Sequence, residues 1–233
     1  MNILKLVDIT KYYGTKNTKK DVLYHLSYQF NDKGLYIIKG ASGSGKSTLL
    51  NVILGFEKPS SGYIVINGKN MCKYKSKDFL KLRSSYATMI YQNCMLLQNF
   101  SVIDNLCLPL FIKNIEITQE EVKRKAIGII KANTPDIDPY SLCRHLSGGQ
   151  KQRICLLRSI ITDSKIILAD EPTGCLDKKN ASKVFKMLKD LSKEKLVIVV
   201  THDEEFASEY GDIYLELKEG KLYEIFNENK LRV

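Results

Sequence analysis

The sequence contains groups that are suited to binding phosphate: a glycine-rich segment followed by a lysine and two hydroxyl residues. Residues 40–48 read GASGSGKST and match G-x-x-x-x-G-K-[ST] at every defined position. Glycines let successive backbone N–H groups turn toward an anion, Lys46 supplies a positive charge, and the Ser47 hydroxyl can ligate Mg²⁺. By itself this loop predicts a nucleoside triphosphatase, a class that includes kinases, GTPases, helicases and motors.

A second anion-binding pattern follows about a hundred residues later. Residues 146–150 read LSGGQ and open a segment rich in arginine and apolar residues. Two glycines at the N-terminus of a helix leave backbone N–H groups and the Ser147 hydroxyl open to an anion. A chain with two such loops on separate lobes can use both if two copies pair head to tail.

Two adjacent carboxylates end an apolar run. Residues 165–172 read KIILADEP, which is typical of a buried strand that delivers Asp170 and Glu171 to the carboxyl edge of a sheet, where ligands of open α/β sheets bind. Phosphoryl transfer needs mainly positioning and charge neutralisation, so one carboxylate for a metal and one for water are sufficient. Taken alone, the same residues fit a solvated turn equally well.

The elements that must position these groups can be placed from periodicity and turn signals. Strands are predicted over residues 3–7, 22–30 and 35–38, and a helix over residues 46–54 that ends at Gly55. Residues 93–161 read as mostly helical, with a capping box at residues 118–121, breaks at Pro135 and Pro139, and a helix over residues 147–161. Strands at 165–169 and 196–200 then alternate with helices at 178–193 and 203–210, before a hairpin of strands at 213–217 and 222–226. This alternation predicts a parallel sheet covered by helices.

The order of these motifs over nearly the whole chain resembles the ATP-binding cassette (ABC) transporter family, whose signature pentapeptide is LSGGQ. The resemblance implies an α/β fold with a RecA-like P-loop NTPase core, an N-terminal antiparallel β subdomain and an inserted α-helical subdomain. It divides the single cassette, residues 1–233, into a core lobe of residues 1–92 and 162–233 and a helical lobe of residues 93–161.

The resemblance also implies roles for individual residues. Asp170 matches the aspartate that holds Mg²⁺, and Glu171 matches the residue that polarises the attacking water. Gln92 follows a strand predicted over residues 86–91 and matches the glutamine that reaches toward Mg²⁺ and water, while His202 matches the histidine that contacts the γ-phosphate. Tyr13 matches the aromatic that stacks on adenine, with an ordinary strand-end tyrosine as the alternative.

The predicted site follows from these matches. The catalytic residues are Lys46, Gln92, Glu171 and His202, and the Mg²⁺ ligands are Ser47, Gln92 and Asp170. The ATP-binding residues are Tyr13, Gly40, Ala41, Ser42, Gly43, Ser44, Gly45, Lys46, Ser47, Thr48, Ser147, Gly148, Gly149, Gln150 and Asp177, the last in a loop that crosses the dimer interface in the family. His25 and His145 have no such support and are predicted to be structural.

Several segments look like the macrolide-exporter and lipoprotein-release branch of the family, which also includes bacitracin-type resistance systems. Three features depart from that branch. Residues 95–98 read MLLQ where a leucine pair followed by proline is common, Cys175 replaces a small Ala or Ser, and residues 133–145 match poorly. These departures concern the helical lobe and its partner and leave the ATP site intact.

Composition narrows the remaining possibilities. The 233 residues are 44% hydrophobic and carry a net charge of +10, which would suit nucleic acid, anionic lipid or a phosphate-rich ligand, although the lysines are scattered as on a solvated surface. The six cysteines lie far apart and are predicted to be reduced thiols. No apolar stretch approaches the ~20 residues that cross a bilayer, and no secretory signal is visible, so a cytoplasmic location is expected.

The sequence therefore predicts the ATP-hydrolysing subunit of an ABC transporter, with ATP and Mg²⁺ as cofactors. It predicts a homodimer, or a pair with a related cassette, that drives a separate membrane permease through the helical lobe, peripheral on the inner face of the membrane and without direct nucleic acid contact. One alternative is a soluble cassette ATPase acting on nucleic acid or ribosomes, but such proteins carry a long coiled coil or two cassettes per chain. Another is a cassette that regulates cell-wall hydrolases through a permease, which shares all of this chemistry.

Overall fold

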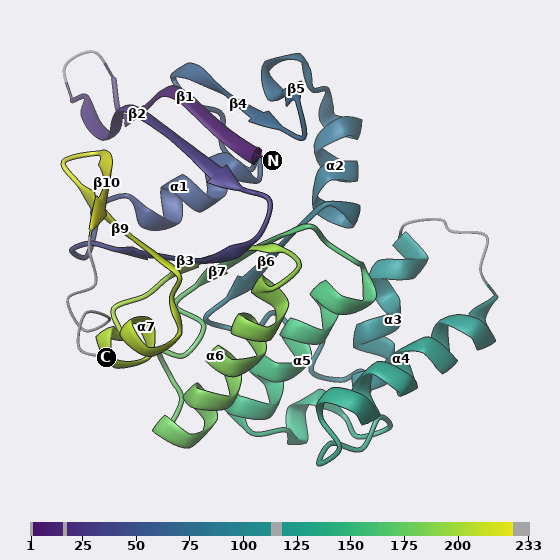
Figure 1. Ribbon diagram of the computed structural model, residues 1–233. Helices are drawn as coiled ribbons and strands as arrows, with labels where there is room; N and C mark the ends of the chain where they lie inside the picture. The colour runs from purple at the N-terminus through teal and green to yellow at the C-terminus, as the bar shows by residue number, and fades with distance from the viewer. Residues whose placement is uncertain (1, 16–17, 113–117, 226–233) are drawn as a thin grey trace.

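The N-terminal part of the chain forms a small antiparallel sheet. The computed structural model describes residues 2–15, 18–112 and 118–225 (Figure 1). In this first sheet the strand order is β2-β1-β4-β5, and every pairing is antiparallel. The strands are β1 (Asn2–Tyr13), β2 (Lys20–Asn31), β4 (Ser61–Ile66) and β5 (Lys69–Asn70).

A second, six-stranded sheet forms the centre of the molecule, in the order β10-β9-β3-β8-β7-β6. All of its pairings are parallel except that of β9 with β10. The strands are β3 (Gly34–Lys39), β6 (Ala87–Tyr91), β7 (Ile166–Asp170), β8 (Leu196–Val200), β9 (Ile213–Lys218) and β10 (Lys221–Ile225).

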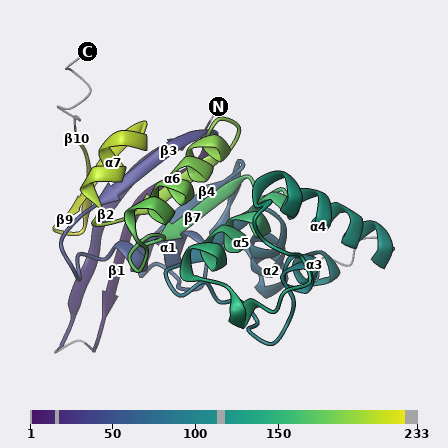
Figure 2. The same cartoon turned by 90° about the horizontal axis from the view of Figure 1, so that it is seen from below.

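Both faces of this sheet are buried, which is why its strands are continuous apolar runs rather than alternating ones. Successive side chains point to opposite faces, so Val197 and Val199 of β8 join one apolar core while Ile198 and Val200 join another. Helix α1 (Lys46–Ile53) lies between the two sheets, and helix α6 (Lys178–Ser192) covers the other face (Figures 1 and 2).

Three helices pack against one another beyond the β6 edge of the sheet, as Figure 1 shows. They are α3 (Val102–Ile112), α4 (Gln119–Asn133) and α5 (Gly148–Ile161). The remaining helices are α2 (Ser76–Ser85), α7 (Glu204–Tyr210) and the short 3₁₀ turns η1 (Met71–Lys73) and η2 (Cys143–His145). Within the described part of the chain, no helix combines the length and the hydropathy that crossing a membrane requires.

The predicted fold class is confirmed, but several element boundaries were wrong. Strand β1 runs for 12 residues rather than the five predicted, because it pairs with both β2 and β4 and absorbs register shifts on the way. Elements β4, β5 and α2 were not predicted; α2 buries only Leu82, so its periodicity is weak. The stretch predicted as mostly helical contains long irregular segments around α3 and α4, and Phe226 of the predicted last strand lies outside the described residues.

Candidate functional site

The phosphate loop lies between β3 and α1, as its sequence context predicted. Gly45 caps the N-terminus of α1 with a φ of 102°, in the left-handed region that favours glycine. A Cβ atom at Gly45 would also lie 2.7 Å from a methyl group of Val22, on β2. No side chain caps this helix, so the first-turn N–H groups face the loop. The local backbone therefore provides an anion-binding helix end.

Lys46 lies inside the loop instead of extending into solvent. Its Nζ donates hydrogen bonds to the carbonyl oxygens of Gly40, at 2.7 Å, and Ala41, at 2.9 Å, and the residue is only 7% exposed. Burial lowers the pKa of Lys46, while the charges of Glu171 and Asp170 act in the opposite direction. The ammonium group is thus held at the loop and faces two carboxylates.

Glu171 and His202 come from neighbouring parallel strands and meet at the carboxyl edge of the sheet. Glu171 follows β7, and its Oε2 accepts a hydrogen bond from the backbone N–H of His202 at 3.2 Å. Its Oε1 lies 3.3 Å from His202 Nε2 but, among the described residues, has no partner with hydrogen-bond geometry. Glu171 also has a φ of 47°, a left-handed conformation uncommon for this residue type. Backbone strain of this kind gathers at functional sites.

Gln92 leaves the end of β6 and reaches toward the loop after β7. Its Nε2 lies 3.5 Å from the Cys175 sulfur, and a Cβ atom at Gly174 would come within 2.9 Å of that same nitrogen. The side chain of Gln92 therefore lies across the segment that follows Glu171.

One cleft of about 590 Å³ brings most of the predicted residues together. It is lined by residues 42–43 and 45–48 of the phosphate loop and by Gln92, Asp170, Glu171 and His202. Val22 and Gly174 also line it. Neither was predicted, because a half-buried valine and a loop glycine carry no chemical signal. Among the described residues, the buried Oε1 of Glu171 at this cleft has no hydrogen-bond partner. The same holds for the buried hydroxyls of Ser44 and Thr173, each of which is next in sequence to a residue that lines the cleft. Donors and acceptors left open at and beside one cleft are what a polar ligand with a metal ion would satisfy.

Tyr13 does not line this cleft, although it lies beside it. Its hydroxyl donates to Glu57, it also interacts with Thr48 of α1, and 42% of the residue is exposed. Lys11 Nζ lies 4.9 Å from the centre of its ring. Burial and the neighbouring Glu57 raise the pKa of Tyr13. Stacking of adenine on Tyr13 stays a prediction.

The LSGGQ segment begins α5, and none of residues 147–150 is among the described residues that line the phosphate-loop cleft. Ser147 and Gln150 form a reciprocal capping box, with the Gln150 N–H donating to Ser147 Oγ at 3.3 Å and the Ser147 N–H donating to Gln150 Oε1 at 3.0 Å. Gly149 packs closely against α6, because a Cβ atom there would lie 2.6 Å from the side chain of Asn180. Asp177 caps α6 by accepting a hydrogen bond from the Asn180 N–H at 2.9 Å. The LSGGQ segment and the loop that contains Asp177 therefore both contact Asn180 and lie side by side.

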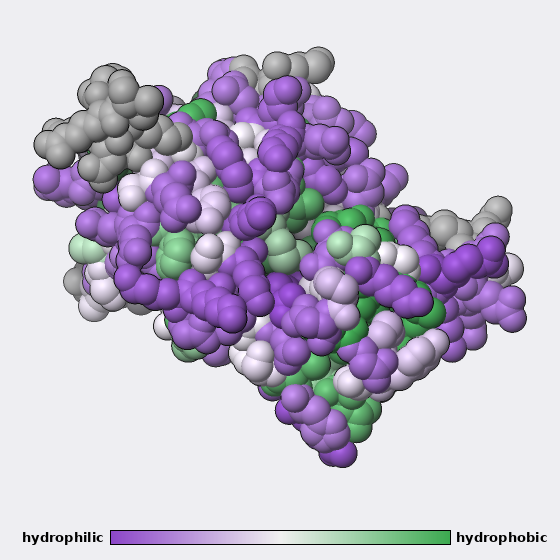
Figure 3. All heavy atoms as spheres, turned by 60° about the horizontal axis from the view of Figure 1, so that its bottom comes forward, coloured by the Kyte–Doolittle hydropathy of each residue, from purple (hydrophilic) through white to green (hydrophobic). Residues whose placement is uncertain are grey.

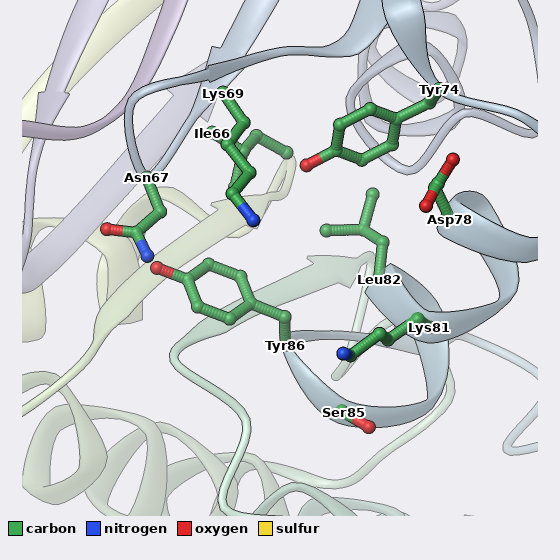
Figure 4. A pocket seen from close by; sticks show the side chains of 9 residues that line it. All are labelled: Ile66, Asn67, Lys69, Tyr74, Asp78, Lys81, Leu82, Ser85 and Tyr86. Carbon is green, nitrogen blue, oxygen red and sulfur yellow. The ribbon is translucent and has the colours of Figure 1, made fainter.

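A separate cavity of about 250 Å³ lies between the β4–β5 hairpin and α2, away from all predicted site residues (Figure 4). Lys69 and the hydroxyls of Tyr74 and Tyr86 point toward it. Burial is the main cause that raises the pKa of both tyrosines. This cavity takes no part in the site described above.

Comparison with known proteins agrees with this geometry. Residues 23–174 match the sequence family described as ABC transporter. The chain is 39% identical over 227 residues to the bacitracin export ATP-binding protein BceA of Halalkalibacterium halodurans, covering 96% of this chain and 88% of that protein. It is 36% identical over 229 residues to the lipoprotein-releasing system ATP-binding protein LolD of Wigglesworthia glossinidia brevipalpis, covering 96% and 97%.

Among solved structures, a dimeric ATP-binding cassette in a post-hydrolysis state with bound ADP and Pi superposes with a TM-score of 0.86. It is 30% identical, and the match covers 97% of this chain and 99% of that one. The chain belongs to the ABC transporter family. It is an ATP-binding cassette and hence an ATPase, as its motifs predicted.

Proposed function

We propose that the chain works as one of two ATP-hydrolysing cassettes that pair head to tail and drive a separate membrane permease. Each ATP then lies between residues 40–48 of one copy and residues 147–150 of the other. The observation that carries this proposal is the separation of the two anion-binding loops, since the signature loop does not reach the phosphate-loop cleft of its own chain. The solved dimer bound to ADP and Pi supports it.

The open polar atoms of the cleft fit ATP with Mg²⁺. Residues 40–48 receive the phosphates, Tyr13 the adenine, and Ser47, Gln92 and Asp170 the metal ion, whose charge neutralises phosphate oxygens when it is bound. Glu171 holds the attacking water, because its buried Oε1 has an acceptor site free. His202 is held against Glu171 and orients that water and the γ-phosphate.

The Glu171→Gln variant tests this assignment. It keeps the size of the side chain but removes the negative charge, so we expect normal ATP binding, hydrolysis lower by about 100-fold or more, and accumulation of an ATP-bound dimer. Sedimentation with and without ATP measures the dimer, and Glu194→Gln serves as a control on an acidic residue outside the cleft. A Glu171→Gln protein that stays monomeric with saturating ATP would contradict the paired arrangement.

An apolar groove supports a permease partner. The groove has a volume of about 410 Å³ and lies between α2, β6, α3 and α5. Apolar side chains exposed along it are Phe56, Leu80, Met95, Leu97, Leu108 and Ile112. Figure 3 shows hydrophobic residues that reach the surface of this protein between hydrophilic ones. Exposed apolar surface of this kind is typical of a protein interaction site.

Both predicted lobes contribute to this groove: seven of its lining residues come from residues 93–161, the predicted helical lobe, and ten from the core lobe, nine of them in residues 1–92. We therefore propose that the cassette consists of these two lobes and that the permease binds where they meet. The names of the two relatives, one in bacitracin export and one in lipoprotein release, support an export or extraction system at the inner face of the membrane.

Co-purification tests the partner. The tagged chain, expressed with the membrane protein encoded beside it, should fractionate with membranes and retain that protein. Leu80→Asp should weaken the association, whereas Tyr140→Asp, at a residue that is 68% exposed outside the groove, should not. Recovery of nucleic acid in place of a membrane protein would favour the soluble cassette instead.

A further inference from the structure

Helix α5 holds the segment around Gln92 through one buried glutamine. Gln152 is only 1% exposed, and its Nε2 donates to the carbonyl oxygen of Tyr91 at 3.2 Å. Its Oε1 accepts a hydrogen bond from the Cys94 thiol. One side chain of α5 therefore bonds to the chain on both sides of Gln92.

A second contact comes from the same face of the helix, three residues further along. The Cys155 thiol donates to the carbonyl oxygen of Cys94 at 2.7 Å, and Cys155 is only 4% exposed. Residues three apart in a helix lie on one face, so Gln152 and Cys155 act on the same short segment. Together their hydrogen bonds fasten residues 91–94 to α5.

The fastened segment has a backbone that needs support. Cys94 and Met95 have φ values of 39° and 42°, both in the left-handed region that residues with a Cβ rarely adopt. Such conformations persist only where the surrounding structure holds them. The hydrogen bonds from Gln152 and Cys155 supply that support, because they hold Tyr91, shortly before the strained pair, and Cys94, its first residue.

We propose that Gln152 and Cys155 are positioning residues for Gln92. They join helix α5, which begins at the signature serine Ser147, to the segment of Gln92, which reaches into the ATP cleft. Helix α5 and this segment therefore move as one body. A shift of Gln92 when the cleft fills is then carried directly to the Ser147 end of α5. This inference rests on the role proposed above for Gln92 in hydrolysis.

The test compares variants that remove only the hydrogen bonds. Gln152→Met keeps the length of the side chain, and we expect its kcat to fall about ten- to a hundredfold with the KM for ATP unchanged, because Gln92 is misplaced but the phosphate loop is intact. Cys155→Ala should lower kcat about fivefold, the effect of one hydrogen bond, and Cys155→Ser should restore most of it because serine keeps the donor.

Ser159→Ala is the matched control. Ser159 is buried on the same helix, but within the described part of the chain its hydroxyl donates only to the carbonyl oxygen of Leu156, in α5 itself, at 2.7 Å. We expect a comparable loss of thermal stability with kcat unchanged. The proposal is overturned if Gln152→Met lowers kcat no more than Ser159→Ala, if the loss lies in KM, or if Cys155→Ser is as impaired as Cys155→Ala.

Two further measurements keep the outcomes separate. If Gln152→Met does not fold, the comparison of Cys155→Ser with Cys155→Ala decides alone. Gln92→Ala is measured in parallel, because full activity in that variant would remove Gln92 from hydrolysis and contradict the proposed function. Impaired Gln92→Ala beside a fully active Gln152→Met would overturn only the positioning role.

Discussion

Helices α1 and α5 both begin at a glycine-rich loop, yet only α1 begins inside a cleft with the groups that phosphate chemistry needs. The N-terminus of α1 has no side-chain cap and is surrounded by Lys46, Asp170 and Glu171. The N-terminus of α5 is capped by its own Ser147 and Gln150. A helix end alone attracts an anion weakly. In the proposed pair of cassettes, the α5 loop would therefore supply only one half of a site, and a second copy would supply the other half.

The largest effect should come from the α1 loop. Lys46→Ala removes a buried ammonium group held between two loop carbonyls and two carboxylates, so we expect ATP affinity to fall about 100-fold or more and hydrolysis to be lost. Equilibrium binding of a fluorescent ATP analogue measures it. Lys186→Ala, at an exposed position of α6, should bind normally. Normal affinity in Lys46→Ala would show that the α1 loop is not the phosphate site.

The α5 loop should respond differently. A Cβ atom at Gly149 meets the side chain of Asn180 at 2.6 Å, so Gly149→Ala should displace the signature loop and lower hydrolysis about tenfold. ATP binding by the single copy should be unchanged, because this loop does not line the cleft. Gly128→Ala in α4 is the control, since a Cβ atom there meets nothing within 4 Å. If Gly149→Ala loses affinity as Lys46→Ala does, the two loops belong to one site within the chain.

The α5 helix also carries an ion pair with a buried arginine. Arg153 is buried and makes two bonds to Asp136, at 2.8 and 2.6 Å. The hydrogen bonds from Arg153 hold the pKa of Asp136 at about 2, below the usual range of an aspartate. A depressed carboxyl pKa contributes stability that is present above about pH 4 and is lost as the pH falls toward about 2.

Asp136→Asn should therefore lower the free energy of unfolding by about 1 kcal/mol at pH 7, a value reduced by the solvent exposure of Asp136. The difference from the unmodified chain should disappear as the pH falls from about 4 to about 2. Urea unfolding across this pH range measures it. Asp190→Asn, in an exposed pair with Lys193, is the control and should change little. A difference that does not depend on pH would contradict the role of the ion pair.

The smallest effect concerns Tyr13, at the edge of the α1 cleft. If its ring stacks on adenine, Tyr13→Phe should change ATP affinity less than twofold, while Tyr13→Ala should lower it about five- to tenfold, within the range of base–aromatic stacking. Competition between ATP and GTP in both variants measures the base contact. Equal affinity in the alanine variant would leave Tyr13 as a strand-end residue bonded to Glu57.

Much of the arrangement of the site could be predicted, because it depends on the local order of residues and elements along the chain. A strand, a glycine loop and a lysine-led helix must follow one another along the chain, and residues 34–53 do so. Carboxyl ends of parallel strands share one edge, so Gln92, Glu171 and His202 could be expected together before any coordinates were known. The missed elements β4, β5 and α2 are short or weakly amphipathic, and β4 pairs with β1, which is distant in sequence.

The sequence by itself determined the family and the fold class, and it singled out the residues that we propose handle phosphate, because these depend on residue type and local spacing. Only the tertiary structure decided which groups touch. The bond from Gln152 to Tyr91 spans 61 residues, and the contact of Gly149 with Asn180 joins two helices. Such pairings depend on how buried side chains pack in three dimensions, which no periodicity along one chain records.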